Sequence, residues 1–126
     1  MENDLVSVIM PVHNAGLFLA ESLESVCRQT YRPLEIVIFD DHSVDDSWEI
    51  ITTWQELFMT NSIQTNFIQS REEKAMGPGY ARNMCVAASG GMYLCHLDAD
   101  VSHNPEVPAD INCNLAGYYG TPQSSG

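Results

Sequence analysis

The chain has 126 residues, of which 44% are hydrophobic, and a formal net charge of −12. These values fit one globular domain and exclude the basic surface by which proteins bind nucleic acid phosphates. The sequence has no apolar run near the ~20 residues that a membrane helix needs, and Pro11 stops the short apolar stretch near the start, so we expect no signal peptide and a cytoplasmic location.

Apolar strands and amphipathic helices alternate in the first half of the chain. Residues 5–11 (LVSVIMP) and 34–40 (LEIVIFD) are predicted to be buried strands. Between them, apolar residues recur at helical spacing over residues 15–29. Ser43 and Asp46 then have the spacing of a capping box, which predicts the start of a second helix. The predicted inner face of that helix carries Trp48, Ile51, Trp54 and Phe58.

The same alternation continues to about residue 98. Residues 65–70 form a weaker third strand pattern, residues 80–89 a helix ended by two glycines, and residues 92–98 a fourth strand. Residues 106–126 have no clear repeat and are predicted to be an irregular tail, with a short helix over residues 110–115. Three strand–helix–strand units with nearly continuous apolar strands predict an α/β fold, a parallel Rossmann-like sheet with helices on both faces.

Polar clusters follow the predicted strands, and parallel strands bring their carboxyl ends to one edge of the sheet. We therefore expect these clusters to converge on one crevice. They are PVHN (11–14), DDHS (40–43), QSREEK (69–74) and DAD (98–100).

Asp98 and Asp100 suit a hard divalent cation such as Mg²⁺ or Mn²⁺, although two solvated aspartates in a turn are the alternative. Zinc held by Cys95, His96, Asp98 and His103 is disfavoured, because strand alternation turns Cys95 away from its neighbours. The four cysteines lack C-x-x-C spacing and are expected to be reduced thiols.

The other clusters contain groups that can bind a nucleotide. Asp40 and Asp41 can accept hydrogen bonds from a base or a ribose, and GPGYARN can place phosphate at a helix N-terminus with Arg82 beside it. An ordinary turn and a surface ion pair are the alternatives for these residues. His13 and His42 follow strands and can be ligand contacts or hydrogen-bonded loop residues.

Three other nucleotide-binding or hydrolytic classes lack their motifs here. The turn after the first strand has one glycine and a proline in place of G-x-G-x-x-G, which argues against a dinucleotide site. The sequence has neither a P-loop nor a G-x-S-x-G elbow.

Taken in order, VSVIMPVHN, LEIVIFDDHS, GPGYARN and YLCHLDAD resemble the donor half of a family 2 glycosyltransferase of the GT-A fold. The resemblance implies a nucleotide-sugar-binding half-domain over residues 1–105, a UDP-sugar donor, and Mn²⁺ or Mg²⁺ as cofactor. It implies that Asp98 lies near the ribose and the metal, and that Asp100 is the principal metal ligand. The residues that it places around the nucleotide are Pro11, Val12, His13, Asp40, Asp41, Arg82 and Asp98.

GPGYARN and DAD are also similar to the branch once described as β-1,3-N-acetylglucosaminyltransferase-like, which includes queuosine-tRNA galactosyltransferase. The acceptor implied is a glycan or, in that branch, a modified tRNA. The family pattern continues beyond DAD with an acceptor-binding region and a general base, so we expect a truncated domain of low or no activity alone. One alternative is a non-catalytic module that binds either a nucleotide or a partner chain, which would complete the sheet. Another is a nucleotidyltransferase, but the phosphate-binding loop of that class is missing from the sequence.

Overall fold

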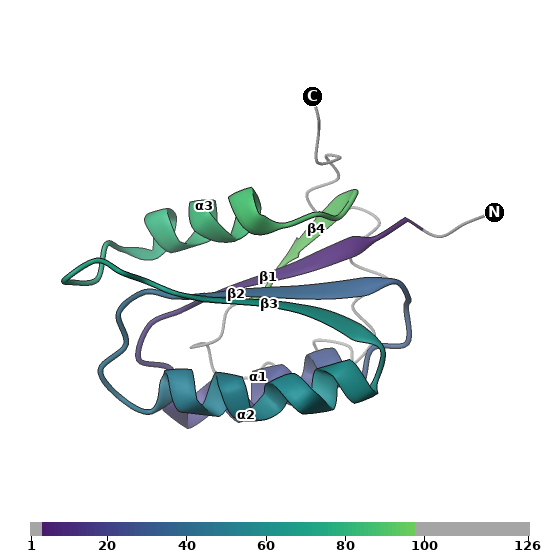
Figure 1. Cartoon of the computed structure of the whole chain (residues 1–126), viewed down its shortest axis with the longest axis horizontal. Coiled ribbons are helices and arrows are strands. Elements are labelled where there is room, and N and C mark those ends of the chain that lie inside the picture. Colours follow the sequence, from purple (N-terminus) through teal and green to yellow (C-terminus); the bar gives the residue numbers. More distant parts are fainter. Residues whose placement is uncertain (1–3, 98–126) are drawn as a thin grey trace.

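The computed structural model describes residues 4–97, in which strands and helices alternate along the chain as predicted (Figure 1). The elements are β1 (Val6–Val12), α1 (Gly16–Cys27), β2 (Leu34–Asp40), α2 (Ser47–Thr60), β3 (Ile63–Gln69), α3 (Pro78–Ala88) and β4 (Tyr93–His96).

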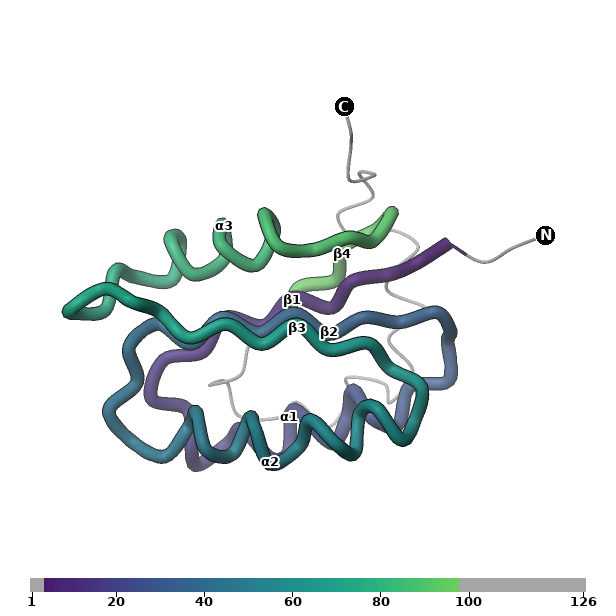
Figure 2. The backbone as a smooth tube through the Cα atoms, viewed as in Figure 1, coloured from purple at the N-terminus to yellow at the C-terminus, as the bar shows by residue number. Residues whose placement is uncertain are grey.

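The strands form one parallel sheet in the order β3-β2-β1-β4. Seen nearly edge-on, the sheet lies between α3 and the layer formed by α1 and α2 (Figure 2). β1 lies inside the sheet and pairs with β2 over its whole length, from Val6↔Leu34 to Val12↔Asp40. β3 pairs with all of β2, so the third strand begins two residues earlier than residues 65–70 predict. The predicted Rossmann-like parallel sheet is confirmed.

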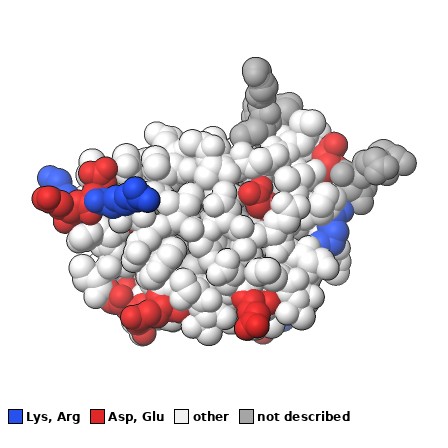
Figure 3. All heavy atoms as spheres, in the orientation of Figure 1, with Lys and Arg blue, Asp and Glu red and all other residues white. Residues whose placement is uncertain are grey.

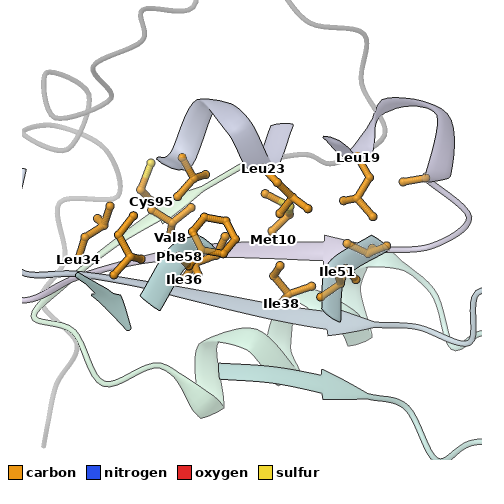
Figure 4. Packing of buried hydrophobic residues seen from close by; sticks show 14 of the residues in the cluster. Val8, Met10, Leu19, Leu23, Leu34, Ile36, Ile38, Ile51, Phe58 and Cys95 are labelled. Atoms are coloured by element: carbon orange, nitrogen blue, oxygen red, sulfur yellow. The ribbon is translucent and has the colours of Figure 1, made fainter. Parts of the chain in front are cut away.

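Helices cover both faces of the sheet, with α1 and α2 on one face and α3 on the other (Figure 1). The larger core lies under α1 and α2, where Leu23, Ile51 and Phe58 pack against side chains of β1 and β2 (Figure 4). A smaller core lies under α3 and includes Phe39 and Cys85. The alternation of side chains along β1 and β2 separates the two cores, because successive residues point to opposite faces.

The predicted start of α2 at Ser43 is wrong. The helix begins at Ser47, and its N-cap residue is Asp46, whose side chain makes no capping hydrogen bond. His42 has a left-handed φ of 58°, and the Ser43 hydroxyl donates to the carboxylate of Asp40. The capping-box pattern therefore failed because a contact outside the helix engages its expected N-cap serine.

Within residues 4–97, no helix is long and apolar enough to cross a membrane. In the space-filling view, basic and acidic side chains gather at the end of the molecule where β3 connects to α3 (Figure 3). That connection carries the exposed residues Arg71 to Lys74. The predicted tail (106–126), the predicted helix at 110–115 and the DAD segment lie outside the described residues.

Candidate functional site

A cavity of about 620 Å³ opens at the carboxyl ends of the strands and beside the N-terminus of α3. This is the edge at which the topology of a parallel α/β sheet places ligand sites. Its lining residues are Pro11, Val12, His13, Asp41, Ala75, Met76, Gly77, Pro78, Gly79, Ala81, Arg82 and His96.

Asp41 fixes the wall of the cavity that leads into α3. Its Oδ1 accepts the Met76 N–H at 2.9 Å, and its Oδ2 accepts the Gly77 N–H at 2.8 Å and the Met76 N–H at 3.1 Å. Gly77 has φ of 106°, which favours glycine, and Pro78 then starts the helix with its fixed φ. The carboxylate therefore holds the start of α3, and with it the helix that carries Arg82, against the end of β2.

His13 is oriented by hydrogen bonds at both ring nitrogens. Its Nδ1 lies 2.8 Å from the carbonyl oxygen of Asp41, and its Nε2 lies 3.3 Å from Nδ2 of Asn14. A carbonyl only accepts, so we assign the ring proton to Nδ1, which leaves Nε2 as the acceptor for the Asn14 amide.

Asp40 lies next to Asp41 in sequence but is not among the residues that line the cavity. Its side chain is fully buried; Oδ1 accepts the Ser43 hydroxyl, and Oδ2 has no hydrogen-bond partner among the described residues. Burial raises the pKa of this carboxyl above its ordinary value, and the Ser43 hydrogen bond only partly opposes that effect.

Asp45 ties together the first turns of α1 and α2. Its Oδ2 accepts the Gly16 N–H at 3.1 Å, and its Oδ1 accepts the Ser47 N–H at 2.9 Å and the Ser47 hydroxyl at 2.6 Å. The Ser47 oxygen in turn accepts the Ala15 N–H at 2.9 Å. One exposed aspartate thus satisfies backbone donors at the start of both helices.

The structure brings together most of the site residues expected from the sequence. Asp98 and Asp100 lie outside the described residues, and so do Asp98 and His103 of the disfavoured zinc set. Within the described part of the chain, no three His, Cys, Asp or Glu side chains converge where they could hold a metal ion. The predicted residues that line the cavity are Pro11, Val12, His13, Asp41 and Arg82.

Met76 and His96 also line the cavity, although neither was predicted to contact a nucleotide. The position of His96 could have been predicted from strand alternation. His96 ends β4, where it pairs with Ile9, and its side chain points to the opposite face from that of Cys95, which is buried in the larger core. Met76 gave no local signal, since its position depends on the distant carboxylate of Asp41.

Comparisons with known sequences identify relatives over most of the chain. Residues 7–110 match the family model described as glycosyl transferase family 2. The glycosyltransferase GlyG of Streptococcus pneumoniae is 33% identical over 135 aligned residues, which cover 98% of this chain and 42% of GlyG. The chain therefore spans less than half the length of this curated relative.

Solved structures share the fold. Residues 1–349 of TarS of S. aureus in complex with UDP-GlcNAc superpose with a TM-score of 0.66 at 27% identity, covering 75% of this chain and 26% of that TarS chain. The mannosyltransferase PcManGT of Pyrobaculum calidifontis, in complex with GDP-Man and Mn²⁺, has a TM-score of 0.73 at 22% identity and covers 92% of this chain and 33% of its own. The second likeness concerns the fold alone.

Proposed function

Because this chain belongs to glycosyltransferase family 2, we propose that its cavity binds the nucleotide of a sugar donor. The observation that carries the proposal is the convergence of Pro11, His13, Asp41 and Arg82 on one cavity at the carboxyl edge of a parallel sheet. These residues come from three separate elements or their ends, so the site is assembled by the fold.

Asp41 is the group that we propose to contact the base or the ribose. Its Oδ1 accepts only the Met76 N–H and has a second acceptor position for a donor on the ligand, whereas Oδ2 already accepts from both Gly77 and Met76. Pro11, Val12 and His13 complete this wall, and Arg82 supplies a forked cation near the nucleotide.

The metal is proposed to be Mn²⁺ or Mg²⁺, held by Asp100 with Asp98. These residues follow β4 directly after His96 and Leu97, and His96 lines the cavity. Two carboxylates one residue apart supply the hard oxygen donors that both ions prefer, so the donor set fits such a metal. When bound, the ion would neutralise charge on the donor diphosphate.

The parent reaction that we propose is transfer of a sugar from a UDP-sugar to an acceptor hydroxyl. The UDP-GlcNAc complex of TarS supports the uridine donor. We propose a glycan as the acceptor. A modified tRNA is the acceptor in the queuosine-tRNA branch, but the net charge of −12 opposes RNA binding by these residues alone.

A titration with UDP, with and without Mn²⁺, tests the donor site. We expect Mn²⁺-dependent binding that Asp100→Ala weakens at least about tenfold, because it removes a metal ligand. Glu56→Ala, which removes an exposed carboxylate from α2, is the matched control and should bind as the parent does.

Two results would change the conclusion. Absence of Mn²⁺-dependent UDP binding refutes the donor site. Binding without transfer or hydrolysis of a UDP-sugar selects the other candidate, a non-catalytic nucleotide-binding module.

A further inference from the structure

Asp40 and Asp41 lie on opposite faces of the sheet. Ile36 and Ile38 of β2 belong to the core under α1 and α2, whereas Phe39 belongs to the core under α3. Side chains alternate along a strand, so Asp40 follows Ile38 to the α1 and α2 face, and Asp41 follows Phe39 toward the cavity. The two neighbouring carboxylates therefore serve different surroundings.

Packing alone does not explain a carboxylate at this position. Asp40 is 0% exposed, and one of its oxygens has no hydrogen-bond partner among the described residues. Burial of a carboxylate with an unsatisfied oxygen opposes folding, whereas an apolar side chain would continue the pattern of β2 without that cost. A role for the oxygen that is bonded would account for the aspartate.

That bonded oxygen begins a chain of hydrogen bonds that leads to the cavity. The Ser43 hydroxyl donates to Oδ1 of Asp40, and its own oxygen accepts the Asn14 N–H at 2.8 Å. Asn14 adopts a left-handed φ of 52°, and its Oδ1 accepts the Val44 N–H at 2.8 Å. Asp40 thus fixes both the turn after β2 and the turn after β1.

The chain of hydrogen bonds ends at His13. The Asn14 side-chain amide donates to Nε2 of His13 at 3.3 Å, and Nδ1–H of His13 donates to the Asp41 carbonyl at 2.8 Å. Because Asp41 follows Asp40 along the chain, these contacts close a ring that includes the ends of β1 and β2. The imidazole is held in one tautomer by partners at both nitrogens.

We propose that Asp40 is a positioning residue of the cavity, which acts through Ser43 and Asn14 to fix the tautomer and orientation of His13. It does this from the opposite face of the sheet, without touching a ligand. The effect on nucleotide binding rests on the proposed function, whereas the effect on His13 does not.

Nitrogen NMR of the His13 ring tests the first part without any ligand. In the parent protein above the ordinary pKa of histidine we expect the Nδ1–H form, assigned by comparison with His13→Gln. Ser43→Ala should shift the ring toward a mixture of tautomers, because it releases the turns after β1 and β2, and with them both the Asn14 amide and the Asp41 carbonyl that hold the ring. Asp40→Asn keeps an oxygen that accepts from Ser43, so it should retain the tautomer that Asp40→Ala loses.

Ser25→Ala is the matched control, because the Ser25 hydroxyl bonds within α1, to the Ser22 carbonyl at 2.8 Å. Its His13 signals should match those of the parent. An unchanged tautomer in Ser43→Ala would overturn the proposal, and this variant keeps the test decisive if Asp40→Ala does not fold.

UDP affinity in the presence of Mn²⁺ is the second measurement. Loss of one positioning hydrogen bond predicts binding about fivefold weaker in Ser43→Ala and unchanged in Ser25→Ala. Unaltered affinity together with an altered tautomer would overturn the positioning role. If the unmutated protein does not bind UDP, the donor-site proposal is wrong. The His13 NMR signals alone then test whether the chain of hydrogen bonds from Asp40 fixes the His13 ring.

Discussion

Replacement of Asp45 by alanine should destabilise the N-terminal ends of α1 and α2 together. The carboxylate accepts the Gly16 N–H at 3.1 Å in α1, and the N–H and hydroxyl of Ser47 at 2.9 and 2.6 Å in α2. Alanine removes all three acceptor contacts. It also releases the Ser47 hydroxyl, whose oxygen accepts the Ala15 N–H.

The magnitude follows from the two helix ends involved. Loss of one capping side chain costs about 0.5–2 kcal/mol, and water can replace part of each bond because Asp45 is exposed. We therefore expect a loss of about 2 kcal/mol for both ends, which for a domain of this size lowers Tm by about 8 °C. Asp45→Asn keeps one acceptor oxygen and should lose about half as much.

Thermal and urea unfolding followed by circular dichroism measure this loss. Asp46→Ala is the matched control, because the neighbouring side chain makes no capping hydrogen bond and its removal should matter much less. An Asp45→Ala variant as stable as Asp46→Ala would refute the double cap.

The pH dependence gives a second check. Burial acts to raise the pKa of Asp45, but hydrogen bonds from Ser47 and Gly16 outweigh it and lower the pKa from its ordinary value of 3.8. A lowered folded-state pKa means that the stabilisation is fully present above about pH 4 and is lost as the pH falls through the folded value. The difference between parent and Asp45→Ala should be constant from pH 8 to 5 and shrink only below that window.

Two further predictions concern close packing and thiol burial. Gly91→Ala should lower the free energy of unfolding by about 2 kcal/mol or more, because the added Cβ would lie 2.8 Å from a backbone nitrogen of β1. Urea unfolding measures this loss, and Gly90→Ala is the control, because its Cβ meets nothing closer than 3.8 Å. Equal losses of stability in the two variants would contradict the prediction. Burial raises the pKa of Cys85 to about 12 and that of Cys95 to about 11, so both thiols should resist maleimide at pH 8 while the partly exposed Cys27 reacts. Peptide mapping that finds all three cysteines labelled in the folded protein would contradict this prediction.

The sequence predicted the architecture because the information for it is local. Strands β1 and β2 are almost unbroken apolar runs, and each helix has an apolar face. A parallel sheet covered by helices on both faces is the arrangement that buries all of these apolar surfaces. The bounds of β2 match the prediction of residues 34–40. The cavity followed from the same topology, since it requires only that the strand ends meet.

The errors and omissions arose where distant residues decide a local question. Ser43 has the right spacing to cap a helix, but its hydroxyl goes to Asp40 and its oxygen takes the Asn14 N–H. A nucleotide-binding role was predicted for Asp40 and Asp41 together, without distinguishing the faces of the sheet on which they lie. Strand alternation, applied to the end of β2, already predicts that the two point to opposite faces.

The position of β1 inside the sheet has a consequence for synthesis of the chain. β1 pairs with β2 on one side and with β4 on the other, and β4 is the last strand among the described residues. A chain that grows from its N-terminus can pair β1 with β2 early, but the other edge of β1 stays open until β4 has left the ribosome. That edge belongs to an apolar strand and can pair with other nascent chains, so the risk of misassembly lasts until β4 is available to cover it.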